Sequence, residues 1–190
     1  MGINWNLGLM RWMPHVDGAG QAYPLNHLHP FRIMMQVGRQ EVLLSVAFAM
    51  HCFSRGSVED DDPADFYTDD REQRTFCRER YALSRLLPSI VHDLPIKPCL
   101  FARDDNFVAI ETVSPYGQVL KYGVFFNLKR WKDVDIDPTD AADLKADVLL
   151  TIQSAYCLDP NKTLPGRGKI KFVRLVELTL QGVKPKPPRR

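Results

Sequence analysis

Two apolar runs near the beginning of the chain are typical of paired β-strands. Phe31–Val37 and Gln40–Phe53 are separated only by Gly38 and Arg39. A two-residue loop with glycine in its first position favours a type II′ hairpin, because glycine accepts the positive φ that this turn requires. The pattern therefore predicts a β-hairpin over residues 31–53.

The segment from Arg78 to Leu94 has a helical period of apolar positions. Pro88 stands inside this pattern. It predicts a kink or a division into two shorter helices, because proline lacks the amide proton of an internal helical hydrogen bond. The apolar positions are Tyr81, Leu83, Leu86, Leu87, Ile90, Val91 and Leu94.

The pattern changes to strands after this helical segment. Two turn-forming sequences, Asp104-Asp105-Asn106 and Ser114-Pro115-Tyr116-Gly117, divide residues 99–128 into three strand-like runs and predict an antiparallel meander. One short helix over Asp137–Ala146 and two further strands are predicted after it. The five predicted strands are Cys99–Arg103, Phe107–Val113, Val119–Leu128, Val148–Tyr156 and Ile170–Leu180.

Three segments have no clear period. They are predicted to form an irregular arm over residues 1–30 with the aromatic anchors Trp5, Trp12 and Tyr23, an acidic loop over residues 55–75, and a basic proline-rich tail over residues 183–190. The length of 190 residues, with 45% hydrophobic and 25% charged residues, suits one globular core. We therefore expect a single α+β domain over residues 1–182. Its sheet should be mainly antiparallel, with about six to seven strands including the N-terminal hairpin, packed with one long or kinked helix.

Charge is distributed unevenly along the chain. Residues 59–72 contain eight acidic residues and one arginine, whereas residues 161–190 contain nine basic residues and one glutamate. Such asymmetry favours a basic surface for phosphates and an acidic segment, around Asp60, Asp61 and Asp62, for a basic partner. Two other interpretations remain open. The acidic loop could cover the basic face of the same chain, or both stretches could simply be solvated.

The cysteine spacing and the apolar runs bear on the location of the chain. Cys52, Cys77, Cys99 and Cys157 are widely separated, which favours reduced, mostly buried thiols over a disulfide framework. The beginning of the chain does not have the pattern of a secretory signal, and no apolar run approaches the length of a membrane span. A cytoplasmic location follows by elimination.

His51 ends a predicted strand at the point where the acidic loop begins. A rigid strand end beside a loop can hold a reactive side chain and leave it accessible, and histidine can act as a general base or acid near neutral pH. The adjacent Cys52 should point to the opposite face of the strand, so His51 could not activate its thiol. The structural alternative is a histidine that is satisfied at the rim of the core.

Polar and basic residues near other strand ends could bind and cleave a phosphodiester. Tyr156 could act as the acid that complements His51, while Arg80, Lys171 and Arg174 could bind phosphate. A metal-independent ribonuclease needs a base for the 2′-hydroxyl, an acid for the leaving oxygen and cations around the phosphorus. The alternative for Arg80 and the neighbouring arginines is ordinary ion pairing with nearby acidic residues.

A third arrangement would use histidines as metal ligands. His27 and His29 alternate in spacing and could bind a metal ion together with His51, as in a metal-dependent hydrolase. No His-Glu-x-x-His or Cys-x-x-Cys motif accompanies them, and the chain contains no glycine-rich nucleotide loop. The sequence therefore predicts neither a bound metal nor a nucleotide cofactor.

Two resemblances to known families bear on function. Tyr156, the basic last strands and the order of helix before antiparallel sheet resemble small bacterial ribonuclease toxins of the RelE-like type, over residues 78–182. The resemblance implies metal-independent RNA cleavage by Lys, Arg, Tyr and His side chains on a sheet. The chain also resembles an uncharacterised group of bacterial proteins, which implies no activity. The residues that carry this second resemblance are His51-Cys52-Phe53-Ser54, Phe76-Cys77, Arg80-Tyr81-Ala82-Leu83-Ser84 and Gln153-Ser154-Ala155-Tyr156.

Two functions from different classes follow from these observations. The first is an RNA-cleaving enzyme, the toxin of a toxin–antitoxin pair or a defence element, with RNA and a small antitoxin as partners. The second is a non-catalytic accessory module of a phage or mobile element that docks another protein through Asp60, Asp61 and Asp62. Neither function requires a cofactor or a membrane.

Overall fold

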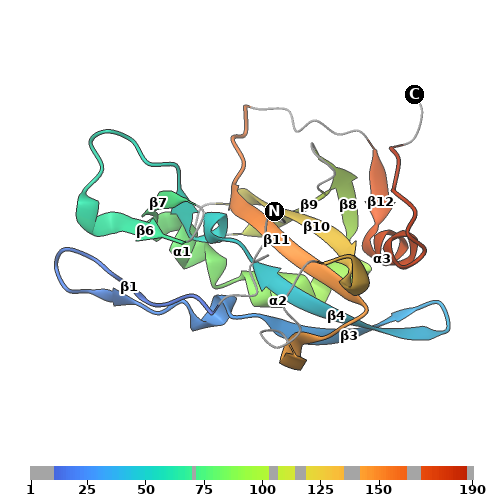
Figure 1. Ribbon diagram of the computed structural model, residues 1–190. Helices are drawn as coiled ribbons and strands as arrows, with labels where there is room; N and C mark the ends of the chain where they lie inside the picture. Colours follow the sequence, from blue (N-terminus) through green and yellow to red (C-terminus); the bar gives the residue numbers. More distant parts are fainter. Residues whose placement is uncertain are drawn as a thin grey trace.

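The computed structural model describes residues 11–69, 72–102, 107–113, 119–134, 142–161 and 168–187. Within these residues, a curled seven-stranded sheet packs with α-helices, and a smaller three-stranded sheet lies at one end (Figure 1). The predicted α+β class and the mainly antiparallel sheet are confirmed.

The main sheet has the spatial order β12–β8–β9–β10–β11–β4–β3. Its described strands pair antiparallel except for β11 and β4, which are parallel. The predicted meander over residues 99–128 is confirmed as β8, β9 and β10, whereas the parallel pair of β4 and β11 joins strands that are far apart in the chain and was not predicted. The strands are β3 (Phe31–Val37), β4 (Gln40–Phe48), β8 (Pro98–Phe101), β9 (Phe107–Val113), β10 (Leu120–Arg130), β11 (Val148–Cys157) and β12 (Lys169–Lys171).

The predicted N-terminal hairpin is confirmed as β3 and β4, but its second strand ends at Phe48 rather than at Phe53, because the chain turns into a 3₁₀ turn over Met50–Cys52. Val37 pairs with Gln40, so Gly38 and Arg39 form the connecting turn, and Gly38 has a φ of 61°. Alternate residues of β3, among them Ile33, face the core. The hairpin therefore supplies one complete edge of the main sheet.

The helical segment after residue 77 is divided. Of the predicted alternatives, one long helix is wrong and the division into two shorter helices is confirmed, because the chain forms α1 (Arg78–Ser84) and α2 (Leu87–Asp93) with a break between them. Pro88 lies in the first turn of α2, where its missing amide proton removes no helical hydrogen bond. Of the predicted helix at Asp137–Ala146, residues 137–141 lie outside the described residues, and Ala142–Leu144 form a single 3₁₀ turn, η7.

The prediction of a last strand over Ile170–Leu180 is wrong. Only β12 is extended, and α3 (Phe172–Leu180) begins directly after it. Phe172, Leu175 and Val176 are fully buried, and their spacing is that of one face of a helix. This helix contacts β10, β11 and β3, so the main sheet curls around it.

The acidic segment has its own secondary structure, which corrects the predicted loop. It forms the small sheet in the order β5–β7–β6, and the N-terminal arm contributes a short hairpin of β1 and β2. The strands are β1 (His15–Val16), β2 (Ala22–Tyr23), β5 (Ser54–Arg55), β6 (Phe66–Thr68) and β7 (Gln73–Phe76). The remaining 3₁₀ turns are η1 (Asn26–Leu28), η2 (Met50–Cys52), η3 (Pro63–Asp65), η4 (Leu94–Ile96) and η6 (Trp131–Asp133).

Trp12 anchors the N-terminal arm to both sheets. Its side chain is 3% exposed, its indole Nε1 donates to the carbonyl of Phe48 at 2.9 Å, and its ring packs edge-on against Phe53 with centroids 5.3 Å apart. Tyr23, another predicted anchor, packs against Phe76. The third predicted anchor, Trp5, lies outside the described residues.

All four cysteines are free thiols, as predicted. Cys52 and Cys99 are buried, whereas Cys77 and Cys157 are partly exposed. None of the helices within the described ranges is long and apolar enough to cross a membrane.

We expect Trp12→Phe to lower the free energy of unfolding by about 1–3 kcal/mol, because the buried carbonyl of Phe48 would lose its donor. Urea unfolding followed by circular dichroism measures this change. Met13→Ala is the matched control, since the Met13 side chain is 72% exposed, and it should change stability by less than about 0.5 kcal/mol. Equal losses in the two variants would contradict the anchoring role of Trp12.

Candidate functional site

The candidate site lies around His51, where the main sheet meets the small sheet. Strand β4 ends and the chain turns through η2, while β11 continues beside it. The amide of Ala49 and the thiol of Cys52 both donate to the carbonyl of Ile152, at 2.9 and 3.5 Å. These contacts bury Cys52 completely, whereas 39% of the neighbouring His51 side chain is exposed.

His51 is paired with a carboxylate from the small sheet. Its Nε2 lies 2.7 Å from Oε1 of Glu72, the residue before β7. An ionised carboxylate only accepts hydrogen bonds, so Nε2 carries the shared proton. Nδ1 of His51 makes no hydrogen bond to any residue that the structure describes. An imidazole oriented in this way, with its second nitrogen available, is suited to general base catalysis.

Glu72 is connected back to η2 through a chain of hydrogen bonds. Its Oε2 accepts from Arg74 at 3.2 Å, Arg74 Nε donates to the buried Ser54 hydroxyl at 3.0 Å, and that hydroxyl donates to the carbonyl of Met50 at 2.8 Å. Burial acts to raise the pKa of Glu72, but the hydrogen bonds and charges of His51 and Arg74 outweigh it and lower the pKa below its ordinary value. Glu72 therefore remains a carboxylate at neutral pH.

Arg80 connects His51 with Tyr156. Its Nη1 donates to the carbonyls of His51 and Ser54, at 3.1 and 2.9 Å. Its guanidinium carbon lies 5.1 Å from the centroid of the Tyr156 ring, which stacks on Phe125. Three of the residues predicted as site residues, His51, Arg80 and Tyr156, are thus neighbours.

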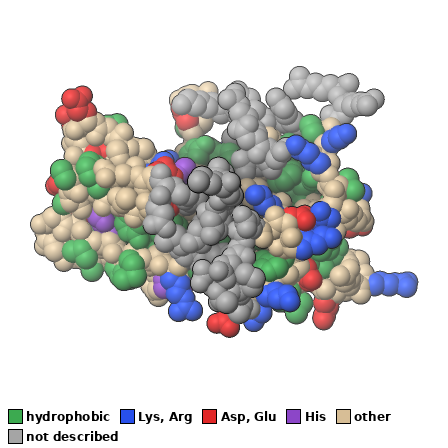
Figure 2. Space-filling model, in the orientation of Figure 1, with side chains coloured by type: hydrophobic (Ala, Val, Ile, Leu, Met, Phe, Trp, Pro, Cys, Tyr) green, Lys and Arg blue, Asp and Glu red, His purple; other side chains and the backbone are tan. Residues whose placement is uncertain are grey.

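The other predicted phosphate ligands lie elsewhere. Lys171 is on β12, opposite Pro98, and three strands separate β12 from β11. Arg174 is on α3, where it pairs with Glu177. Figure 1 shows β12 and α3 at the other end of the molecule from the small sheet, and most Lys and Arg side chains visible in Figure 2 lie over that half. The structure therefore does not bring Lys171 and Arg174 to His51.

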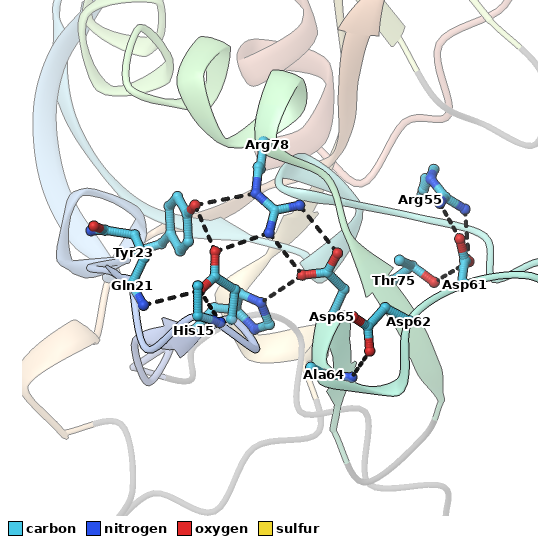
Figure 3. Close-up of polar contacts among 12 residues, drawn as sticks. His15, Gln21, Tyr23, Arg55, Asp61, Asp62, Ala64, Asp65, Thr75 and Arg78 are labelled. Carbon is cyan, nitrogen blue, oxygen red and sulfur yellow. Dashed lines mark hydrogen bonds and ion pairs between the residues drawn. The ribbon is translucent and has the colours of Figure 1, made fainter.

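The acidic residues predicted to bind a partner differ in their surroundings (Figure 3). Asp61 accepts from Arg55 and, at 2.6 Å, from the Thr75 hydroxyl, and these contacts, Arg55 first, lower its pKa below the ordinary range. Asp62 caps η3 by accepting from the amide of Ala64 at 2.9 Å. Asp60 is exposed. Two of the three acidic side chains thus already have partners in their own segment.

Arg78 joins three parts of the chain that the sequence did not connect (Figure 3). It donates to Asp17 of the N-terminal arm at 3.0 Å, to Asp65 of the acidic segment at 3.1 Å and to the Tyr23 hydroxyl at 3.1 Å. The buried His15 lies 3.5 Å from Asp65 through its Nε2. This arrangement fixes the N-terminal arm and the small sheet to the beginning of α1.

The predicted histidine ligands are not gathered around one point. His27 Nε2 lies 2.8 Å from the Ser84 hydroxyl, and burial, together with the charge of Arg85, lowers its pKa to about 4. His29 Nε2 lies 3.2 Å from the carbonyl of Trp12. In the described part of the chain, no three His, Cys, Asp or Glu side chains are arranged to hold a metal ion.

Glu72 is the important residue that the sequence analysis did not single out. It is one of eight acidic residues in its segment, and nothing in its spacing distinguishes it from the others. Its contact with His51 depends on the fold of the small sheet. The acidic composition of this segment predicted a loop instead of these strands.

We expect the stabilising effect of Asp17 to disappear in acid. Hydrogen bonds from Arg78 and from the amide of Gln21 lower its pKa from 3.8 to about 2. The ionised Asp17 therefore makes its full contribution to the free energy of unfolding above pH 3.8. This contribution is lost as the pH falls through 2, where the carboxylate is protonated in the folded state as well. Urea unfolding should show that wild type is more stable than Asp17→Asn at pH 6 and that the difference narrows towards pH 2. A difference that stays constant would contradict this account.

Comparison with known proteins places the chain in a family. The YjaZ family model matches residues 14–180, a range that includes His51, Glu72, Arg80 and Tyr156. The comparison with curated proteins found no match, and the comparison with solved structures found none. The resemblance to RelE-like ribonuclease toxins therefore has no support. Since the match covers most of its length, the chain belongs to the YjaZ family.

Proposed function

We propose that this chain is an RNA-directed enzyme that cleaves phosphodiester bonds without a metal ion, with His51 as its general base. The observation that carries the proposal is the 2.7 Å contact between His51 Nε2 and Glu72 Oε1 in a partly exposed position. It supports base catalysis because a carboxylate fixes the tautomer of the imidazole and stabilises the imidazolium that forms.

In the proposed reaction, Nδ1 of His51 accepts the proton of a ribose 2′-hydroxyl. The 2′-oxygen forms a bond to phosphorus as the bond between phosphorus and the 5′-oxygen breaks. The hydroxyl of Tyr156 donates its proton to the leaving 5′-oxygen. The products are a 2′,3′-cyclic phosphate and a free 5′-hydroxyl, so the reaction requires RNA and excludes DNA.

Arg80 is the proposed phosphate ligand next to the base. Only its Nη1 donates to carbonyls among the described residues, and its guanidinium carbon lies over the Tyr156 ring. The remaining N–H groups suit the non-bridging oxygens of a phosphate. Lys171 and Arg174 are assigned to RNA outside the cleaved bond, because the width of three strands separates them from β11.

The proposal of a protein-docking accessory module has less support. Asp61 and Asp62 already bind groups of their own segment, which leaves Asp60 as the exposed member of that set. A role as a toxin or defence element, with a small antitoxin as partner, is a finer form of the enzymatic proposal. For a toxin, expression of the wild-type chain in growing cells should arrest growth, and this arrest should depend on His51.

We expect the purified chain to cleave single-stranded RNA in the presence of EDTA and to release ends with a 2′,3′-cyclic phosphate. His51→Ala should reduce the rate by about 100-fold or more, because the base is lost. Glu72→Gln should reduce it by about 10- to 100-fold, because the imidazole loses its orienting partner. Gel analysis of end-labelled RNA measures both rates.

His92→Ala is the matched control, since His92 is an exposed histidine on α2. It should leave the rate unchanged, and an RNA with a deoxyribose at the cleaved position should be resistant. Absence of RNA cleavage by wild type, or equal rates for wild type and His51→Ala, would refute the proposed function.

A further inference from the structure

A groove of about 830 Å³ lies at the far end of β10 from the candidate site. It is lined by Arg130, the last residue of β10, and by residues of the chain that follows α3, among them Gly182 and Pro187. Phe101 and Phe107, which are almost completely buried, also line it. The groove therefore lies between the end of β10 and the chain that follows α3.

Arg130 is held in position from two sides. Its Nε donates to Asp133 at 2.5 Å, and its guanidinium packs against the backbone of Gly182. A Cβ on Gly182 would lie 2.5 Å from Arg130 Nη1, and Gly182 also has a φ of 70°. Glycine thus serves two needs here, the turn that ends α3 and the space for the guanidinium.

The side chains around the groove favour an anion. Lys129, Arg130 and Lys184 line it, whereas Asp133 is the one acidic residue in the described lining, and it is bonded to Arg130. Neither Nη1 nor Nη2 of Arg130 makes a hydrogen bond to the described residues. A guanidinium that is fixed through Nε and Gly182 is preorganised to bind phosphate oxygens through these two nitrogens.

We propose that this groove binds phosphate groups of single-stranded RNA, as a second contact for the substrate of the candidate site. The choice of RNA over another polyanion rests on the proposed function. Gly123 of β10 pairs with Tyr156, and the seven residue-to-residue steps from Gly123 to Arg130 span roughly 23 Å. One mononucleotide therefore cannot contact both sites, whereas a chain of several nucleotides has the necessary length.

The test is RNA binding by the His51→Ala protein, in which cleavage is disabled. A fluorescein-labelled single-stranded RNA is titrated at several salt concentrations, and its anisotropy gives Kd. Arg130→Ala should weaken binding about tenfold and reduce the slope of log Kd against log salt by about 0.7. Gly182→Ala should weaken binding to a similar degree, because its new methyl group displaces the guanidinium.

Gly20→Ala is the matched control for backbone strain. Gly20 has a φ of 80°, and a Cβ there would meet no atom within 4 Å. The Gly20→Ala variant should leave Kd unchanged, although it forces alanine into a positive φ just as Gly182→Ala does. Unchanged binding in Arg130→Ala, or equal weakening by both glycine variants, would overturn the proposal.

Competition separates the possible occupants of the groove. Unlabelled RNA should displace the probe far better than inorganic phosphate, a mononucleotide or polyglutamate. Displacement by polyglutamate as effective as that by RNA would overturn the assignment in favour of an acidic protein segment. RNA that binds through Arg130 but is never cut by wild type would leave the groove assignment standing and remove only the proposed function.

Discussion

The carbonyl of Ile152 fixes the point at which the main sheet gives way to the small sheet. It accepts the amide of Ala49 and the thiol of Cys52, and these two contacts hold η2 against the part of β11 that β4 does not cover. A buried carbonyl without donors would be costly, so the end of β4 and the start of η2 are determined together. Because Cys52 turns inward at this point, its neighbour His51 remains partly exposed.

The small sheet supplies the second half of the candidate site. Strand β7 places Arg74 beside Ser54 of β5, and Glu72 at its start reaches His51. The N-terminal arm is joined to this part of the chain through Arg78, which pairs with both Asp17 and Asp65, and through the ring of Trp12, which packs on Tyr67 of β6. The candidate site therefore forms only where the two sheets meet, because each sheet supplies part of it.

The features that could be predicted from the sequence are those with local causes. Gly38 between two apolar runs defines the β3–β4 hairpin, and Pro88 marks the division of the helical segment. The error at α3 also has a local cause. Phe172, Val173 and Leu175 fit a partly alternating pattern, but the burial of Phe172, Leu175 and Val176 follows the helical period.

The features that could not be predicted depend on contacts between distant residues. The β4–β11 pair joins residues about one hundred positions apart in the chain, such as Leu44 and Val148, without a local signal. His51 lies in η2, just beyond the end of β4 rather than within the predicted strand, and its partner Glu72 belongs to a segment whose acidic composition resembles an exposed loop. Composition reports the net charge of a segment and not which of its carboxylates contacts a distant histidine.

The protonation of the His51 ring gives the most direct test of the central claim, which is that Glu72 holds this imidazole ready to accept a proton at Nδ1. Nitrogen-15 NMR of histidine-labelled protein, at an alkaline pH where histidine is ordinarily neutral, distinguishes the two tautomers. The account predicts a proton on Nε2 and none on Nδ1 for His51, with this preference lost in Glu72→Gln. A proton on Nδ1 of the wild type, or the same spectrum in both proteins, would contradict it.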